Sequence, residues 1–590
     1  MKNTILMTIV LVLGLATLSN AQEPLSFRSN ALGGIIDDDL DLIYDPIELQ
    51  FVDSLRLYTN LSNLTSGNEK LFDNISDDEF LIGISSKNPF MKSIWHSALV
   101  RFQNSETSNS VGIDSDLDGY MDVTGNGTLI DEYTAYLDTD YDGLYDQKNI
   151  LTQEKSDFIT NESYSLILNN SFNLGKMILG VKLSSSKMTT TGSTAFMPLG
   201  SGHGILSSVY PEDPTYARSV TTYLIEDEYN NQFWSDNGTF NSTNMESNTG
   251  IRSSAMFPLS TIELRGDLVY YLSKGQSDIG DSYSGEYEYF DPEITEYENN
   301  YSETHLLNLE EKEDGAGIIL GGSIRNTFSK QEERKNDGYW EIGFSFNLGS
   351  YDYTNSISLE FVSNETSLDG ELSYDDFIRT ISDEYSTTDN GTGKLNIIKI
   401  NSRFNIPLGE KVQFGIGGFL NRSTNNRETK FREFVNDITN YNYTDSEYND
   451  DDYVTTETSQ LTADRTYDIY STTFTCPVGM EYHLGDKNNW SLRFGTIFIS
   501  TSQTVNDAKQ ITDSEPDVTE TEYGDGDVTI DIENNIYESI SEHTRTASSS
   551  TVFTYGLGYN PTKNLQIDML GIGSGDLEFD GVRLSFSVKF

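Results

Sequence analysis

The 590-residue chain has few cysteines, histidines and basic residues. Cys476 is the single cysteine, so an internal disulfide framework is excluded. Only five histidines are present, and none lies in a recognisable nucleophile or zinc motif, so we expect no enzymatic activity. The 38 Lys and Arg against 93 Asp and Glu give a formal charge of −55. Such a balance argues against nucleic acid as a partner, because nucleic-acid binding needs clustered basic residues.

Long apolar runs are missing after the first residues. Residues 1–21 contain an early lysine, the apolar stretch ILMTIVLVLGLATL and a Ser-Asn-Ala cleavage site, which is typical of a signal peptide that is removed on export. No later run reaches the roughly 18 apolar residues of a membrane-spanning helix. No Pro-rich or Gly/Ser-rich linker divides the chain, and we therefore expect one large unit after the signal peptide.

Apolar residues at every second position are what the chain has in abundance. The last strand-like stretch sets Val582, Leu584, Phe586, Val588 and Phe590 against Arg583, Ser585, Ser587 and Lys589. Similar patterns occur at 163–184, 261–272, 339–349, 356–364, 394–420, 490–500 and 551–570. Because side chains alternate between the two faces of a strand, each stretch has one apolar and one polar face. Each apolar file is about the 9–11 residues that a tilted strand needs to cross a bilayer.

The connections between these stretches fall into two classes. Short, turn-like segments occupy 173–176, 407–411, 484–489 and 560–564, whereas long polar segments occupy 104–158, 187–247, 273–302, 365–391, 423–463 and 503–543. The long segments hold most of the acidic charge, and we expect them to be loops. Short turns on one side and long loops on the other are the layout of an outer-membrane barrel.

With these features, residues 51–590 resemble bacterial outer-membrane β-barrel proteins. The resemblance implies an all-β, transmembrane antiparallel barrel of about 16 strands (14 to 18), with short periplasmic turns and long acidic extracellular loops. It also implies a bacterial outer-membrane location, contact with lipid and lipopolysaccharide, and folding by the barrel-insertion machinery. The signal for that machinery would be the alternating C-terminal residues Val582, Leu584, Phe586, Val588 and Phe590.

Charged residues occupy the polar face of these apolar strands. A soluble β-sandwich or solenoid would also give alternating strands, but a water-filled lumen tolerates such charges better than a packed core does. We predict that the lumen is lined by Lys182, Glu263, Arg265, Asp267, Glu341, Glu360, Lys399, Arg403, Arg493, Asp568 and Arg583.

Two Asp-rich loops within 104–158, at 114–127 and 138–149, share the pattern D-x-D-x-D-G-x-x-D. Alternate carboxylates on a tight turn can converge on one calcium ion, and the loops resemble those of thrombospondin type 3 and dockerin repeats. The candidate ligands are Asp114, Asp116, Asp118, Tyr120 (through its carbonyl), Asp122, Asp138, Asp140, Asp142, Leu144 (through its carbonyl) and Asp146. Gly125 and Asn149 replace the usual bidentate Glu, so a ligand from elsewhere is required; a solvated acidic loop is the alternative.

The segment before the barrel, residues 22–50, is predicted to be periplasmic or a plug. Within it, 28–49 resembles the opening segment of the long-chain fatty-acid transporter family, with Gly33 and Gly34 matching and Asp45-Pro46-Ile47 replacing an N-P-A-type motif. The resemblance implies a segment inside the lumen and passage of hydrophobic small molecules. A mobile leader is the alternative.

These observations predict a porin or transporter that passes small solutes, hydrophobic ones among them, with outer loops stiffened by calcium. A structural or adhesive surface protein, whose outer loops bind a partner or surface, is the alternative.

Overall fold

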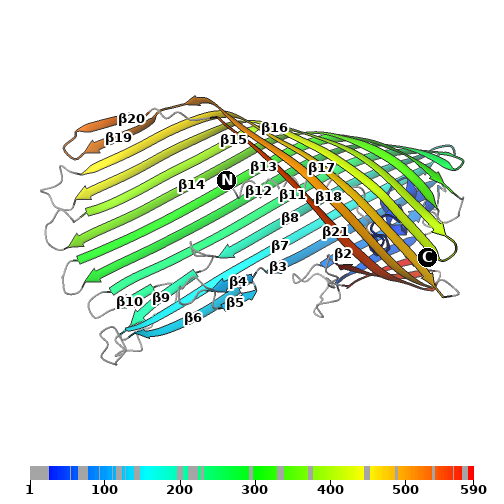
Figure 1. Cartoon of the computed structure of the whole chain (residues 1–590), viewed down its shortest axis with the longest axis horizontal. Helices are drawn as coiled ribbons and strands as arrows, with labels where there is room; N and C mark the ends of the chain where they lie inside the picture. The colour runs from blue at the N-terminus through cyan, green and yellow to red at the C-terminus, as the bar shows by residue number, and fades with distance from the viewer. Residues whose placement is uncertain are drawn as a thin grey trace.

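The fold was analysed in a computed structural model, which consists almost entirely of long strands (Figure 1). It describes residues 26–36, 38–52, 55–63, 78–88, 90–91, 93–108, 110–113, 123–126, 128–137, 147–195, 203–209, 223–226, 231–291, 297–328, 338–369, 377–443, 452–485, 489–533, 539–562, 564–573 and 582–590. The signal-peptide region lies outside these residues.

Sixteen of the described strands form a closed antiparallel ring. In ring order they are β1 (Arg56–Asn63), β2 (Asp78–Lys87), β3 (Ile94–Ser108), β7 (Gln147–Asn173), β8 (Ile178–Ala195), β11 (Asn231–Leu259), β12 (Ile262–Asp291), β13 (Tyr297–Thr327), β14 (Tyr339–Asp369), β15 (Phe377–Leu408), β16 (Val412–Tyr443), β17 (Tyr453–Leu484), β18 (Trp490–Ser514), β21 (Ile540–Thr562), β22 (Leu565–Gly573) and β23 (Val582–Lys589). The ring closes where Arg56 of β1 lies opposite Lys589 of β23. The predicted all-β antiparallel barrel of 16 strands is confirmed.

Closure of the ring satisfies the backbone without leaving a free sheet edge around the barrel, as a bilayer requires. The tight turns 260–261 and 409–411 lie at the same end as the start of β1 and the end of β23. We call this the turn end. Five further strands widen the sheet toward the opposite, far end: β6 (Thr128–Leu137), β9 (His203–Val209), β10 (Tyr223–Glu226), β19 (Asp517–Tyr523) and β20 (Val528–Glu533). A separate hairpin joins β4 (Ser110–Ile113) and β5 (Val123–Asn126).

The strands are longer than the sequence predicts. β12 to β17 contain 30 to 32 residues each, so segments 273–302, 365–391 and 423–463, predicted as loops, lie largely in strands. The other segments predicted as loops, 104–158, 187–247 and 503–543, are also strand over most of their length. Both faces of these extensions carry polar residues, and alternation of apolar and polar residues therefore disappears from the sequence. By contrast, β22, β23, β1 and β2 contain only 8 to 10 residues. The wall is tall along β11–β18 and low at the closure.

The outer face of the barrel carries an apolar band next to the turn end. On β14, Ile342, Phe344, Phe346 and Leu348 are 43–58% exposed, whereas Glu341 and Asn347 on the inner face are each 7% exposed. Beyond Leu348 the outer face turns polar, with Asp352 exposed. The band is therefore about nine residues high, which matches the hydrocarbon core of a bilayer.

Three short helical elements precede the barrel: α2 (Phe27–Ala31), α3 (Asp39–Tyr44) and the 3₁₀ helix η1 (Glu48–Phe51). Ser26 caps α2 by accepting a 2.9 Å hydrogen bond from the Ser29 amide. Gly33 and Gly34, with φ of 66° and 74°, end the helix in the left-handed conformation that glycine favours. None of the helices in the described part of the chain is long and apolar enough to cross a membrane.

Candidate functional site

Residues 26–52, which we call the inner segment, lie inside the ring. Ile35, Ile36 and Leu40 have no exposed surface. One apolar cluster joins the segment to the inner faces of β1, β2, β3 and β7, and it comprises Leu40, Leu42, Ile43, Leu49, Val52, Tyr58, Leu81, Leu99 and Ile167. The hydrophobic effect therefore fixes one side of the segment to the low wall near the closure.

A chain of buried ion pairs anchors α2 to β17, β18 and β22. The Arg28 guanidinium lies 2.6 Å from Glu481 and 3.4 Å from Asp38. Glu481 also accepts from Arg493 Nε at 2.8 Å, and Arg493 Nη1 lies 2.5 Å from Asp568. All five side chains are at most 4% exposed. Because buried charges are tolerated only when they are paired, this chain fixes where α2 can lie.

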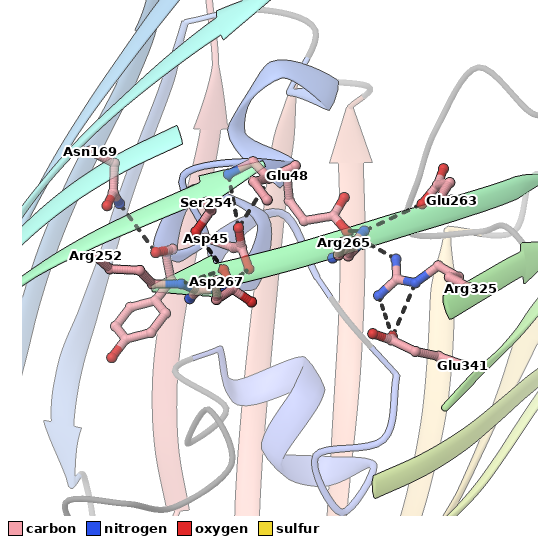
Figure 2. Close-up of polar contacts among 12 residues, drawn as sticks. Asp45, Glu48, Asn169, Arg252, Ser254, Glu263, Arg265, Asp267, Arg325 and Glu341 are labelled. Carbon is pink, nitrogen blue, oxygen red and sulfur yellow. Dashed lines mark hydrogen bonds and ion pairs between the residues drawn. The ribbon is translucent and has the colours of Figure 1, made fainter. Parts of the chain in front are cut away.

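Glu48 of η1 anchors the end of the segment (Figure 2). Its carboxylate pairs with Arg265 of β12, and Arg325 Nη1 of β13 lies 3.0 Å away. Arg325 also donates to Glu341 of β14 at 2.8 Å, and Arg265 lies 3.4 Å from Glu263. Three neighbouring strands thus present charges to one residue of the segment.

Asp45, three residues before Glu48, anchors the segment to β11 (Figure 2). Its Oδ1 accepts a 2.8 Å hydrogen bond from the Ile47 amide, which shapes the turn at Pro46, and its Oδ2 lies 3.4 Å from Arg252. Arg252 in turn pairs with Asp267 at 2.8 Å. Contacts with β11, supported by Asp267 of β12, therefore also fix the position of the inner segment.

Two hydrogen bonds and a cation–π contact complete the attachment of the inner segment to the wall. Asn169 and Ser97 both donate to the Ile43 carbonyl, at 2.8 and 2.9 Å. The Lys182 ammonium lies 3.3 Å from the centre of the Tyr44 ring, a cation–π contact. Arrangements of this kind can hold a segment in one register and can release it when its charges are hydrated or bound elsewhere.

Comparisons with known proteins find no matching family model and no matching curated protein. Among solved structures, the siderophore receptor PiuA from Acinetobacter baumannii is 7% identical with a TM-score of 0.24, covering 91% of this chain and 82% of that one. The ferripyoverdine receptor of the outer membrane of Pseudomonas aeruginosa is 8% identical with a TM-score of 0.24, covering 91% of this chain and 71% of that one. The copper transporter OprC is 6% identical with a TM-score of 0.24, covering 91% of this chain and 80% of that one. At such TM-scores the chains do not superpose, so the fold is established by the strand pairing of this chain alone. None of these findings supports the fatty-acid transporter resemblance.

The structure places most predicted lumen residues on the inner face. Lys182, Glu263, Arg265, Asp267, Glu341, Arg493 and Asp568 contact the inner segment or its partners, and Lys399 and Arg403 are half-buried on the same face. Glu360 is a correction: it is exposed on the outer face, opposite the exposed Leu306. The apolar–polar alternation fails there because this part of β14 lies beyond the apolar band.

Other predicted residues cannot be placed in the same way. The side chain of Arg583 and all ten candidate calcium ligands of the two Asp-rich loops lie outside the described residues. On β23, Ser585 and Ser587 are buried on the inner face, so Leu584, Phe586 and Val588 alternate to the outer face, and Phe590 is 68% exposed.

The sequence analysis missed the charges of the inner segment and several of their partners. Arg28, Asp38, Asp45 and Glu48 are interleaved with apolar residues such as Ile35, Leu40 and Ile43 within 28–49, and that interleaving was the available signal for buried pairing. Their partners Arg252, Arg325 and Glu481 carried no pattern of their own.

Glycines on the inner face of the barrel wall leave space for the backbone of the inner segment. A side chain added at Gly479 of β17 would overlap the Leu32 carbonyl. We therefore expect Gly479→Val to displace the inner segment at a cost of about 1–3 kcal/mol, and to allow trypsin to cleave after Arg28, which is 4% exposed in the intact chain. Mass spectrometry of the new N-terminus measures this. Gly266→Val is the matched control, because nothing lies within 4 Å of a Cβ there. Equal cleavage in the two variants would contradict the seat described above.

A second polar group lies on the inner face of the tall wall, farther from the turn end than the apolar band. The Arg427 guanidinium is 3.7 Å from the ring centre of Tyr353 and 4.8 Å from that of Tyr467. Its Nη1 lies 3.6 Å from Glu311 and 3.8 Å from Glu313. These ion-pair distances are too long for hydrogen bonds.

Glu313 of this group makes the stability of the folded chain depend on pH. Burial raises the pKa of Glu313 to about 7, against the opposing effect of Arg427 and with smaller contributions from Glu311 and Glu246. Between the ordinary value of 4.5 and about 7, the folded chain holds a proton that the unfolded chain has lost. The contribution to stability is therefore present below pH 4.5 and declines as the pH rises to about 7.

We expect Glu313→Gln to flatten this part of the curve of stability against pH, by roughly 3 kcal/mol at most. Urea unfolding of the folded chain in detergent, measured from pH 4 to 8, checks it. Parallel curves for the unaltered chain and the Glu313→Gln variant would show that Glu313 is not the source of this pH dependence.

Proposed function

We propose that this chain is an outer-membrane transporter of small solutes, whose lumen is closed by its own inner segment. The supporting observation is the combination of a closed sixteen-stranded ring with a buried segment that pairs ionically with the wall. Barrels of this strand number can leave an aqueous channel when nothing fills them. The apolar outer band supports a location in lipid, and its height matches that of an outer-membrane barrel.

The lining behind the inner segment is amphipathic. One side is the apolar surface of Tyr58, Leu81, Leu99 and Ile167. The other side carries the charged residues of β12 to β22, which remain on the wall when the segment leaves. Such a lining suits small solutes with both polar and apolar parts better than purely hydrophobic ones.

Displacement of the segment separates three groups of ion pairs, so opening is costly unless water or a partner replaces the lost contacts. The proposed mechanism is therefore gating: the segment is closed at rest and moves when a solute or a partner protein shifts the balance. Solute passage then follows the wall strip that the segment has vacated.

The experiment that tests membrane insertion and the barrel is electrophoresis of the outer-membrane fraction before and after boiling. We expect the unboiled chain to migrate differently from the boiled chain, because a closed barrel resists cold detergent. Recovery of the mature chain in a soluble fraction without detergent would overturn the proposal. A barrel that is heat-modifiable but never passes solute would favour the structural or adhesive alternative.

Calcium binding by the two Asp-rich loops is part of the same proposal. Their matched spacing supports weak sites, with affinities on the order of 10⁻⁴–10⁻³ M. We expect calcium to protect residues 104–158 from protease and a chelator to remove that protection. The alternative of a solvated acidic loop is retained if limited proteolysis followed by mass spectrometry gives the same fragments under both conditions. Delivery by the barrel-insertion machinery and contact with lipopolysaccharide belong to the proposal as well.

A further inference from the structure

The sheet has a free edge at the far end of the barrel, where the tall wall stops. β21 pairs with β22 only from Phe553 onward, and no described strand pairs with the same edge of residues 540–552. Among the described strands, β20 pairs with β19 alone. β19 and β18 both pair with β17, and β20 and β21 lie on their other side, so both unpaired edges face away from β17. We call residues 528–533 and 540–552 the free edge.

The free edge begins where the apolar band ends. β22 covers β21 from Phe553 to the turn end, a stretch about as long as the band. The twelve residues 540–551 are all exposed, and so are all six residues of β20. Figure 1 shows β19 and β20 at the far end of the long strands. The free edge therefore lies in water, where its unpaired amide and carbonyl groups can accept a further strand.

The β19–β20 hairpin holds the upper part of this edge in a fixed position. Gly526, with φ of 87°, forms the turn, and the Asp527 amide donates to Asp525 Oδ1 at 2.9 Å. The Gly524 amide donates to the Asp452 carbonyl at 2.7 Å, which joins the hairpin tip to the start of β17. The hairpin is thus attached through β19, and β20 presents its other edge outward.

β20 carries an exposed apolar stripe beside its unpaired backbone. Val528, Ile530 and Ile532 are 49%, 60% and 56% exposed, and they share one face because side chains alternate along a strand. Asp531 and Glu533 lie on the other face. Folded proteins normally protect an edge strand from pairing, and an apolar edge left in water is costly. The stripe and the unpaired edge together indicate a surface that a further strand covers.

The charge of the hairpin selects the partner. Residues 515–533 contain eight carboxylates and no Lys or Arg. Like charges on adjacent strands destabilise a pair, whereas opposite charges stabilise it. A second copy of this chain would bring the same acidic hairpin to the edge and be repelled. A strand with basic residues opposite Asp531 and Glu533 is attracted instead.

We propose that β20 binds, by strand addition, an extended basic segment of another protein in which apolar residues alternate with Lys or Arg. The backbone of that segment forms hydrogen bonds with the free edge, and its apolar side chains continue the stripe of Val528, Ile530 and Ile532. Its basic side chains lie opposite Asp531 and Glu533. This interaction goes beyond solute passage, because it involves neither the lumen nor the inner segment.

The test uses a short fluorescent peptide of alternating valine and lysine, titrated with the purified full-length chain in detergent at about 0.15 M ionic strength. We expect a saturable rise in anisotropy. Ile530→Ser should weaken binding about tenfold, and Asp531→Asn combined with Glu533→Gln about fivefold. These side chains are exposed, so the variants are expected to fold, and heat-modified mobility verifies this.

A photoreactive group on the peptide locates the binding site. Trypsin releases residues 510–545 as one fragment, because no Lys or Arg lies between Lys509 and Arg545. We expect mass spectrometry to find the label in this fragment. A label confined to other fragments would overturn the proposal, as would the absence of saturable binding.

Ile378→Ser is the matched control. Ile378 is 43% exposed, but its strand β15 is paired on both edges, with β14 and with β16. Binding by this variant should equal that of the unaltered chain. The same peptide with methylated backbone nitrogens keeps its charge and loses its amide donors, so we expect it not to bind. Equal binding of the methylated peptide, or of a peptide of alternating valine and glutamate, would contradict strand addition to an acidic edge.

Discussion

A chain without residues 26–52 is expected to conduct ions steadily in planar bilayers, whereas the full chain is expected to remain closed for most of a recording. The inner segment occupies the lumen with an apolar face against β1, β2, β3 and β7 and ionic contacts to Glu481, Arg265 and Arg325. Its removal leaves charged walls facing water, and a ring of sixteen strands is wide enough for an aqueous channel. The expected change is from rare openings to a stable conductance.

The shortened chain has to form the same barrel for this result to count. Heat-modified mobility of the unboiled protein provides that control, and Gly266→Val in the full chain provides a variant with a substitution that leaves the segment seated. A shortened chain that folds and stays silent would show that something other than the inner segment closes the lumen.

Removal of Glu481 is expected to have the second largest effect. Its carboxylate is fully buried and pairs with both Arg28 and Arg493. Glu481→Ala leaves two guanidiniums close together without their shared counter-ion, and breaking a buried pair in this way costs about 3–5 kcal/mol. We expect the segment to leave its seat, so that openings in planar bilayers become frequent and trypsin cleaves after Arg28.

The matched control is Glu310→Ala, which removes a carboxylate from an exposed ion pair with Lys312. Exposed pairs contribute about 0–1 kcal/mol, so little change is expected. Frequent openings in the Glu310 variant, or none in the Glu481 variant, would mean that buried pairing does not hold the segment.

How far the sequence predicts the fold depends on where lipid or protein constrains a strand. Within the apolar band, one face meets an apolar medium, so the alternation of Trp340 to Leu348 identifies the strand and its inner residues. Beyond the band both faces carry polar residues. The extensions of β12 to β17 therefore look like loops in the sequence, and Glu360 was assigned to the wrong face for the same reason.

The seat of the inner segment was predictable only in outline. The resemblance that Gly33 and Gly34 support suggested a segment inside the lumen, but Arg28 and its partner Glu481 are 453 positions apart. No local pattern links two such residues, because their contact follows from ring closure and from the rotation of each strand.

Disulfide trapping measures the central claim, that the inner segment lies against the barrel wall, most directly. A Cβ at Gly556 of β21 would lie 2.7 Å from Ala31 Cβ, and a shift of about 1 Å allows a disulfide. In a Cys476→Ser background, Ala31→Cys with Gly556→Cys is expected to cross-link on export, which non-reducing electrophoresis after trypsin detects as a retained N-terminal fragment. Ala31→Cys with Gly266→Cys is expected to remain unlinked. Absence of the first cross-link in a heat-modifiable barrel, or equal linking of both pairs, would contradict the account.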